Sequence, residues 1–143
     1  MEYEYTTTED VPVTDLSEVE DSLPDSKIRA INGVLGCQNL SVNLWYFEEG
    51  EEIGYHAHSE QEELFYVLEG TFSVKLGRSG ETEIVTLEEG SFWAAAPMVG
   101  RGHRCVSEKG VVLAIGAPNV HDPGLDPHKL SDDEIDEALE ERS

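Results

Sequence analysis

The segment GEEIGYHAHSEQEELFYVLEG, residues 50–70, holds more chemical information than any other part of this chain. His56 and His58 are separated by one residue, and Glu63 stands at the head of the β-type run that follows. If residues 55–58 form a strand, both imidazoles project from the same face, because side chains alternate along a strand. A short turn would then return Glu63 to their side on the next strand. The segment therefore predicts a cluster of two histidines and one carboxylate.

A fourth candidate for this cluster is His103, in the later segment PMVGRGH. Imidazole nitrogens and carboxylate oxygens are ligands that suit borderline divalent transition metals. We therefore expect one metal ion per chain inside a β-barrel, and its expected ligands are His56, His58, Glu63 and His103. Fe(II), Mn(II), Ni(II), Co(II) and Zn(II) all accept such ligands, so the residues alone do not choose the metal.

From Lys27 onward the chain consists of short β-rich runs separated by glycine-containing turns. Regular short strands of this kind indicate a sandwich or a barrel. No helix-period segment interrupts the region, which excludes parallel α/β folds. The expected strands are 27–35, 40–47, 63–68, 71–76, 82–87, 91–96, 103–107 and 111–117.

The N-terminal flank has a different character. Residues 1–26 contain two prolines and few apolar side chains, which favours a solvated acidic arm. The alternation in Glu2–Tyr5 leaves a second possibility open, an edge strand with one aromatic face. The expected division of the chain is an arm over 1–26, a barrel over 27–118, and a connector with a C-terminal helix over 119–143.

The C-terminal flank begins as an extended proline-rich connector and ends in a short helix. Ser131 and Glu134 form a capping box, with Ser131 as the N-cap residue. The helix is expected to reach about Arg142. Its apolar stripe, formed by Ile135 and Leu139, is thin, so we expect it to dock weakly on the barrel or on a partner subunit.

Two motifs in the chain resemble those of the cupin family. The first cupin motif, G(X)5HXH(X)3–4E(X)6G, is matched at every fixed position by Gly50, His56, His58, Glu63 and Gly70. The second, G(X)5PXG(X)2H(X)3N, is matched in order and type by Gly90, Pro97, Gly100 and His103. It departs by one extra residue in each of its first two spacers, and Ser107 stands in place of the asparagine. The resemblance covers about residues 34–117.

This resemblance implies an all-β fold, a small double-stranded β-helix of the jelly-roll type, with the arm and the helix outside it. It also implies that the four candidate ligands hold the metal. The spacing to Gly70 favours Glu63 over the adjacent Glu62. The resemblance does not imply a reaction, because cupins include dioxygenases, isomerases, decarboxylases, sugar binders and storage proteins.

Residues in phase with the ligands are expected to line a small, largely apolar pocket, although plain barrel core is an equally good interpretation for each aromatic residue. The strand 40–47 presents either Trp45 with Asn43 or Tyr46 with Leu44, and Phe92 and Trp93 face oppositely, so that one of them points inward. The expected pocket residues are Trp45, Phe65, Val67, Trp93, Arg101 and Cys105.

Three side chains near the second motif invite a specific interpretation. Arg101 would stand at the pocket mouth, where a guanidinium can bind a carboxylate or phosphate of a substrate in a bidentate manner. Arg104 is expected to point outward. Cys105 shares the face of His103, and packing beside the metal is favoured over a direct redox role.

His121 and His128 lie in the acidic connector and are expected to be solvated.

The formal net charge is −22, from 31 acidic and 9 basic residues. Residues 1–26 carry nine acids and no base, and residues 121–143 carry nine acids and two bases, so the flanks supply most of the charge. Such a field repels nucleic acid and anionic membranes. The few lysines favour a salt-loving, haloarchaeal source over an ordinary protein with acidic tails.

Several expectations concern the setting of the protein. No apolar run approaches the ~20 residues of a membrane span, and the N-terminal residues lack the basic and apolar regions of a signal peptide. We therefore expect a cytoplasmic protein in which Cys37 and Cys105 are free thiols. A homodimer is expected, with the arm that carries Tyr3 and Tyr5 exchanged onto an open sheet edge.

The expected function is that of a metal-dependent enzyme acting on a small oxygenated or aromatic metabolite. The family resemblance implies dioxygenase-like or isomerase-like activity. The rival hypothesis is a non-catalytic module, such as a sensor or a sugar-binding cupin. No general base is obvious beyond the expected metal ligands, and this favours the non-catalytic module.

Overall fold

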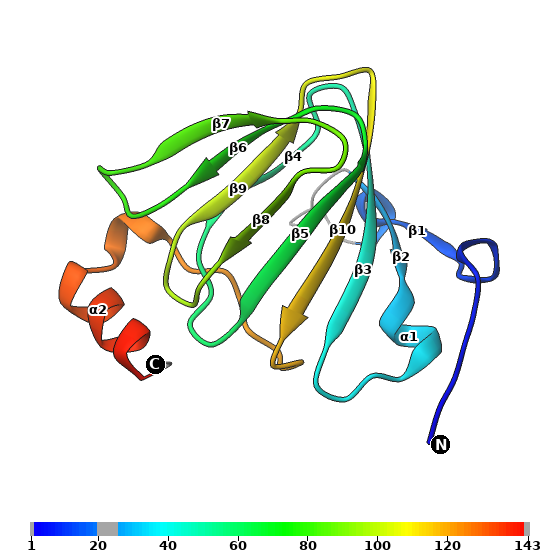
Figure 1. The fold of residues 1–143 in the computed structure, drawn as a ribbon, viewed down its shortest axis with the longest axis horizontal. Coiled ribbons are helices and arrows are strands. Elements are labelled where there is room, and N and C mark those ends of the chain that lie inside the picture. Colours follow the sequence, from blue (N-terminus) through cyan, green and yellow to red (C-terminus); the bar gives the residue numbers. More distant parts are fainter. Residues whose placement is uncertain (1, 20–25, 142–143) are drawn as a thin grey trace.

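The structure is a computed structural model that describes residues 2–19 and 26–141. Its strands form two antiparallel sheets (Figure 1). The six-stranded sheet has the order β1 (Val13–Asp15), β2 (Lys27–Ala30), β3 (Ser41–Glu48), β10 (Lys109–Ala117), β5 (Glu62–Glu69) and β8 (Phe92–Ala95). The four-stranded sheet has the order β4 (Glu52–His56), β9 (Arg101–Cys105), β6 (Phe72–Leu76) and β7 (Glu83–Leu87). This is the expected all-β, double-stranded β-helix.

The hydrophobic core lies between the two sheets and follows the period-two alternation of the strands. Phe65 and Val67 point inward from β5, and Val112 and Ala114 do so from β10. Burying a valine or phenylalanine side chain contributes roughly 1.5–3 kcal/mol. A one-residue slip of β5 would place Phe65 outside the core, so burial of this face fixes the register that aligns Glu63 with the site.

The expected strand 27–35 is wrong in its second half. Strand β2 ends at Ala30, and a short helix α1 (Ile31–Leu35) follows and packs against β3. Gly36 ends the helix at φ 69°, in the left-handed region that glycine adopts readily, and its N–H donates to the carbonyl of Asn32. A helix therefore interrupts the β-rich region that showed no helical periodicity, because one turn is too short to show a period.

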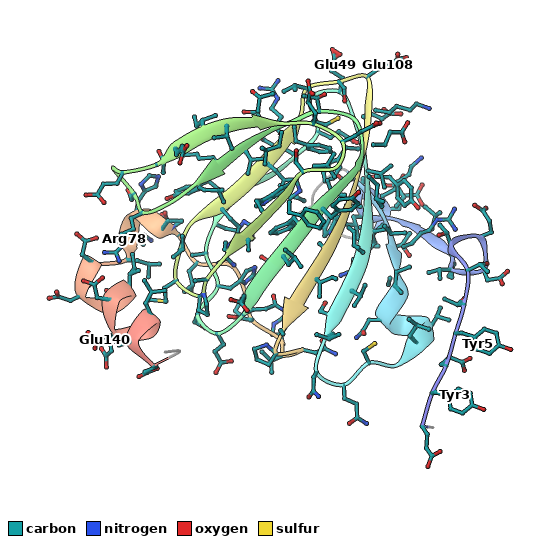
Figure 2. The ribbon with its side chains drawn as sticks, viewed as in Figure 1. Tyr3, Tyr5, Glu49, Arg78, Glu108 and Glu140 are labelled. Carbon is teal, nitrogen blue, oxygen red and sulfur yellow. The ribbon has the colours of Figure 1, made fainter. Side chains whose placement is uncertain are left out.

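The N-terminal flank is partly a solvated arm and partly an extension of the larger sheet. Tyr3 and Tyr5 are exposed, at 79% and 83%, and point away from the barrel (Figure 2). Residues 2–7 form no strand, so the alternative of an aromatic edge strand there is wrong. The chain then forms two 3-10 helices, η1 (Thr8–Asp10) and η2 (Leu16–Glu18), on either side of β1, which pairs with β2. The rest of the expected arm, residues 1 and 20–25, lies outside the described residues.

The C-terminal helix α2 (Asp132–Glu140) begins with the expected capping box between Ser131 and Glu134. It lies beside the end of β6 and β7, after the 3-10 helix η3 (Pro127–Lys129) (Figure 1). Arg78 lies in the β6–β7 turn, beside α2 (Figure 2). It pairs with Asp132 at 3.2 Å and with Asp136 at 2.6 Å. The helix is thus docked on its own barrel.

The helices of the described ranges, 2–19 and 26–141, include none that is both long enough and apolar enough to cross a membrane. The proposed helix end at Arg142 lies outside these ranges.

Candidate metal centre

His56, His58 and Glu63 converge at the point where β4 ends and β5 begins. One ligand atom from each of the three residues lies within 4.8 Å of the others. The ring centroids of His56 and His58 are 4.8 Å apart, and Nε2 of His58 lies 3.6 Å from Oε1 of Glu63. Alternation along the extended segment therefore places the two imidazoles together, as the spacing predicts. Glu62, the neighbouring carboxylate, points to the exposed side.

The backbone orients both imidazoles toward a common centre. Nδ1 of His56 donates to the carbonyl of Gly54 at 2.6 Å, and Nδ1 of His58 donates to the carbonyl of Asp122 at 2.7 Å. A carbonyl oxygen only accepts, so each Nδ1 carries a proton, and in the neutral form of each ring Nε2 is the nitrogen that keeps the lone pair. Burial lowers the pKa of His56, which favours its neutral, ligating form. Donation of the second ring nitrogen to a carbonyl is the usual support for a metal-binding histidine.

His103 lies deeper, at the centre of β9, and is almost fully buried. Its ring stands 5.2–5.4 Å from the rings of Phe47, Phe65 and Trp93. Neither of its buried nitrogens has a hydrogen-bond partner. Burial, with a smaller effect from the charge of His56, lowers the pKa of His103 to about 3, so the ring is neutral at pH 7.

His103 is not part of the group of ligand atoms that lie within 4.8 Å of one another. Its two unpaired nitrogens nevertheless fit a ligand role, because a buried polar group without a partner costs free energy unless something satisfies it. The donor set of neutral imidazoles and one carboxylate fits a divalent transition metal. The side chains of His58 and Glu63 are 14% and 17% exposed, so the group is not fully sealed from solvent.

Arg101 is not at an open pocket mouth, contrary to the position expected from its phase on the strand. Its side chain is fully buried, with Nη1 3.2 Å from Oε1 of Glu63, and Nη2 donates to the carbonyl of Ala96. Burial lowers the pKa of Arg101, and the adjacent carboxylate opposes this effect. The guanidinium is therefore engaged with the candidate ligand Glu63 and with the backbone of the second-motif loop.

The strand register decides which aromatic residues point inward near the site. Trp93 is buried and stacks on Phe65 at a centroid distance of 4.8 Å, whereas Phe92 is 64% exposed. On β3, Trp45 packs against the core beside Phe47, so the face that carries Trp45 and Asn43 points inward. Of the expected pocket residues, Phe65 and Trp93 lie against His103, while Val67 belongs to the core.

Cys105 is fully buried, pairs with Phe72 across the sheet, and its Sγ donates to the carbonyl of Ser107 at 3.4 Å. These contacts agree with a packing role. Both cysteines are free, as expected. Arg104 and His121 are exposed, as expected. His128 is exposed but not only solvated, since its Nδ1 lies 2.5 Å from Oγ of Ser79.

The residue that sequence reasoning missed is Asp122. The backbone carbonyl of Asp122 contacts His58, and the side-chain carboxylate of Asp122 accepts hydrogen bonds from the loop that follows His58. Burial alone would raise the pKa of Asp122, but hydrogen bonds from Glu60, Gln61 and Ser59 outweigh this effect and lower it. No spacing signal could have identified the residue, because Asp122 lies in the connector, far along the chain from the motif that it contacts.

A second missed feature is Met98, in the second-motif loop. Its φ is 70°, in the left-handed region that residues other than glycine seldom adopt. Its N–H donates to the carbonyl of His58 at 2.7 Å. The loop that precedes β9 is therefore bonded to the backbone of one candidate ligand, as well as to the side chain of Arg101.

Comparison with solved structures shows the same fold in proteins of low sequence identity. KdgF from Halomonas sp. is 19% identical, covers 82% of this chain and 96% of its own, and has a TM-score of 0.66. A sugar phosphate isomerase of the cupin superfamily from Silicibacter pomeroyi is 18% identical, over 80% of this chain and 75% of its own, with a TM-score of 0.63. The polyketide cyclase RemF from Streptomyces resistomycificus is 18% identical, over 95% of this chain and 92% of its own, with a TM-score of 0.67.

These identities establish a likeness of fold alone. No curated protein matches the chain. The family model described as "Cupin domain" matches residues 43–116, which include all four candidate ligands. Because this match spans more than half of the sequence, the chain belongs to the cupin domain family.

Proposed function

We propose that this cupin is a metal-dependent enzyme that acts on a small oxygenated or aromatic metabolite. The observation that carries the proposal is the convergence of His56, His58 and Glu63, together with the unpaired, buried nitrogens of His103 on β9, the strand that pairs with β4. One divalent ion per chain, Fe, Mn, Ni, Co or Zn, would be held by these four side chains. When bound, such an ion supplies Lewis-acid or redox chemistry to a substrate at an open coordination position.

The residues of the chain support this role in distinct ways. In their neutral forms, His56 and His58 present Nε2 lone pairs without a change of tautomer, because each Nδ1–H is already held by a carbonyl. Glu63 brings the only carboxylate of the group. The rings of Phe65 and Trp93 exclude water from the inner side of the site, so a substrate approaches from the side where His58 and Glu63 are exposed.

The reaction class is proposed as isomerase-like or dioxygenase-like. Two proteins of similar fold, a sugar phosphate isomerase and a polyketide cyclase, favour chemistry on a small oxygenated molecule. An isomerase needs a group that moves a proton, and Glu63, whose side chain is 17% exposed, is the candidate within the group. A dioxygenase needs a redox-active ion with a substrate and dioxygen beside it, and the buried rings of Phe65 and Trp93 give the centre an apolar inner side.

A non-catalytic binding module is the second candidate. One observation favours it: Arg101, the basic residue that pairs with Glu63, is occupied by this carboxylate and by the carbonyl of Ala96. The site would then bind a small oxygenated ligand or a sugar without converting it. In either role, a homodimer is proposed, because Leu64, Leu68 and Phe92 expose an apolar area on the outer face of β5 and β8.

The test is a turnover screen with the purified chain loaded separately with each of the proposed metals. Sugar phosphates, small oxygenated acids and small phenols are supplied, and products and dioxygen consumption are measured. Conversion that disappears in Glu63→Ala, while the barrel remains folded, supports the enzyme. Dioxygen uptake distinguishes the two reaction classes. Saturable binding without any product, for every metal and compound class, would instead support the binding module.

A further inference from the structure

The connector that follows β10 makes several hydrogen bonds to the loop that carries His58. Ala57 and Leu125 exchange backbone hydrogen bonds of 3.0 and 2.7 Å, which makes an isolated antiparallel bridge. Nε2 of Gln61 donates to the carbonyl of Pro118 at 3.3 Å. The connector therefore runs beside the segment between the two motif histidines and Glu63, although the two segments are far apart in sequence.

Asp122 is the centre of this contact. Its backbone carbonyl accepts the Nδ1–H of His58 at 2.7 Å. Its carboxylate accepts the N–H groups of Glu60 and Gln61, each at 2.9 Å. The same carboxylate accepts the hydroxyl of Ser59 at 3.0 Å and the N–H of Ser59 at 3.3 Å. One residue thus engages the imidazole and the following three backbone N–H groups.

These bonds have a direct geometric consequence for the candidate ligands. The turn over residues 59–61 decides where Glu63 stands relative to His58. Three consecutive N–H groups that point at one carboxylate fix the path of this turn, because hydrogen bonds to a charged acceptor are stronger than those to a neutral one. The carbonyl contact fixes the ring orientation of His58 and leaves its Nε2 as the ligand atom.

We propose that Asp122 is a positioning residue for the metal centre, which holds His58 and the turn before Glu63 in ligating geometry. This inference rests on the proposed metal-binding function. It assigns the acidic connector to the site as its outer support, because the carbonyl of Asp122 holds the ring of His58 directly and its carboxylate reaches Glu63 only through the backbone of the turn.

The matched variants are Asp122→Asn and Asp126→Asn. Asp122→Asn keeps the size of the side chain and leaves the backbone carbonyl of residue 122 in contact with His58. It removes the charge and turns one acceptor of the side chain into a donor that faces backbone N–H groups. The second removes the same charge from the same connector. The carboxylate of Asp126 accepts the N–H of His128 within the connector, at 3.0 Å, so it serves as the control.

The first measurement is titration with Co(II), followed by its visible absorption bands, which report ligand geometry. Asp122→Asn should lower the affinity by about 10–100-fold and alter the bands, as loss of an outer support of a metal ligand does. Asp126→Asn should leave both unchanged. If Asp122→Asn does not fold, Ser59→Ala removes the 3.0 Å hydroxyl contact alone and should still lower the affinity by a few-fold.

The second measurement needs no metal. In the metal-free chain, hydrogen exchange at the N–H groups of Glu60 and Gln61 should be about tenfold faster or more in Asp122→Asn, and unchanged in Asp126→Asn. Unaltered exchange together with unaltered Co(II) affinity would overturn the positioning role. If the unmodified chain itself binds no Co(II), the proposed metal function fails, and the exchange rates alone then decide whether Asp122 holds the turn.

Discussion

Arg101 and Glu63 form an ion pair inside the barrel, with Nη1 3.2 Å from Oε1, and the arginine side chain is fully buried while that of Glu63 is 17% exposed. The same oxygen lies 3.6 Å from Nε2 of His58. Glu63 is therefore balanced by a neighbouring positive charge in addition to its place among the candidate ligands.

Removing this positive charge should destabilise the barrel. We expect Arg101→Met to lower the free energy of unfolding by about 3–5 kcal/mol, because the partner carboxylate loses its compensation in a buried setting. Arg104, on the same strand, is exposed, and Arg104→Met should change stability by less than about 0.5 kcal/mol. Urea unfolding of the two variants without metal measures both. Equal, small effects would show that the ion pair contributes nothing.

Replacing His103 should separate metal binding from stability. The two ring nitrogens are buried without partners, so His103→Leu should leave the metal-free barrel as stable, or more stable by up to about 1–3 kcal/mol. The same variant should bind Co(II) much more weakly, because it lacks a ligand. Thermal unfolding and metal titration are the two readouts. Unchanged Co(II) affinity would remove His103 from the ligand set.

Gly70, the last glycine of the first motif, should not tolerate a side chain. Its φ is 86°, and a Cβ there would overlap the carbonyl oxygen of Lys109. Gly80 has a φ of 85° but nothing within 4 Å of a Cβ, so Gly80→Ala isolates the backbone strain, about 1–2 kcal/mol. Gly70→Ala should cost more than this in chemical unfolding. A smaller cost at Gly70 would mean that the β5–β6 turn moves freely.

The capping box at the start of α2 should weaken in acid. Hydrogen bonding from the backbone N–H and hydroxyl of Ser131 lowers the pKa of Glu134 below the ordinary 4.5. A lowered folded-state pKa means that the contribution to stability is complete above pH 4.5 and is lost as the pH falls through the lower value. In Glu134→Gln, the capping box persists with a neutral acceptor, so the difference in stability from the unmodified chain should shrink below pH 4.5. Glu137→Gln is the control on the same helix. A difference that is constant with pH would contradict the role of the ionised carboxylate.

The meeting of His56, His58 and Glu63 could be predicted from the sequence because strand alternation is a local property. The spacing of His56 and His58 alone places both rings on one side. The choice between Phe92 and Trp93 needed the pairing of Phe65 with Trp93 across two strands, which no local pattern contains. The contacts of Arg101 and Asp122 likewise depend on segments that meet only in the folded chain.

The helix α1 could not be predicted from the sequence pattern, because a single turn of helix that ends at Gly36 is too short to show a periodicity. The division of the chain at residues 26 and 118 remains a prediction, as do a salt-loving source, a cytoplasmic location and a dimer.

The most direct test is the metal content of the purified chain, measured by elemental analysis beside that of a His56→Ala, His58→Ala double variant. We predict one equivalent of a divalent transition metal in the unmodified chain, at about 2.0–2.2 Å from nitrogen and oxygen ligands by X-ray absorption. The folded double variant should contain almost none. Equal metal in both proteins, or none in the unmodified chain after supply of all five metals, would contradict the metal centre.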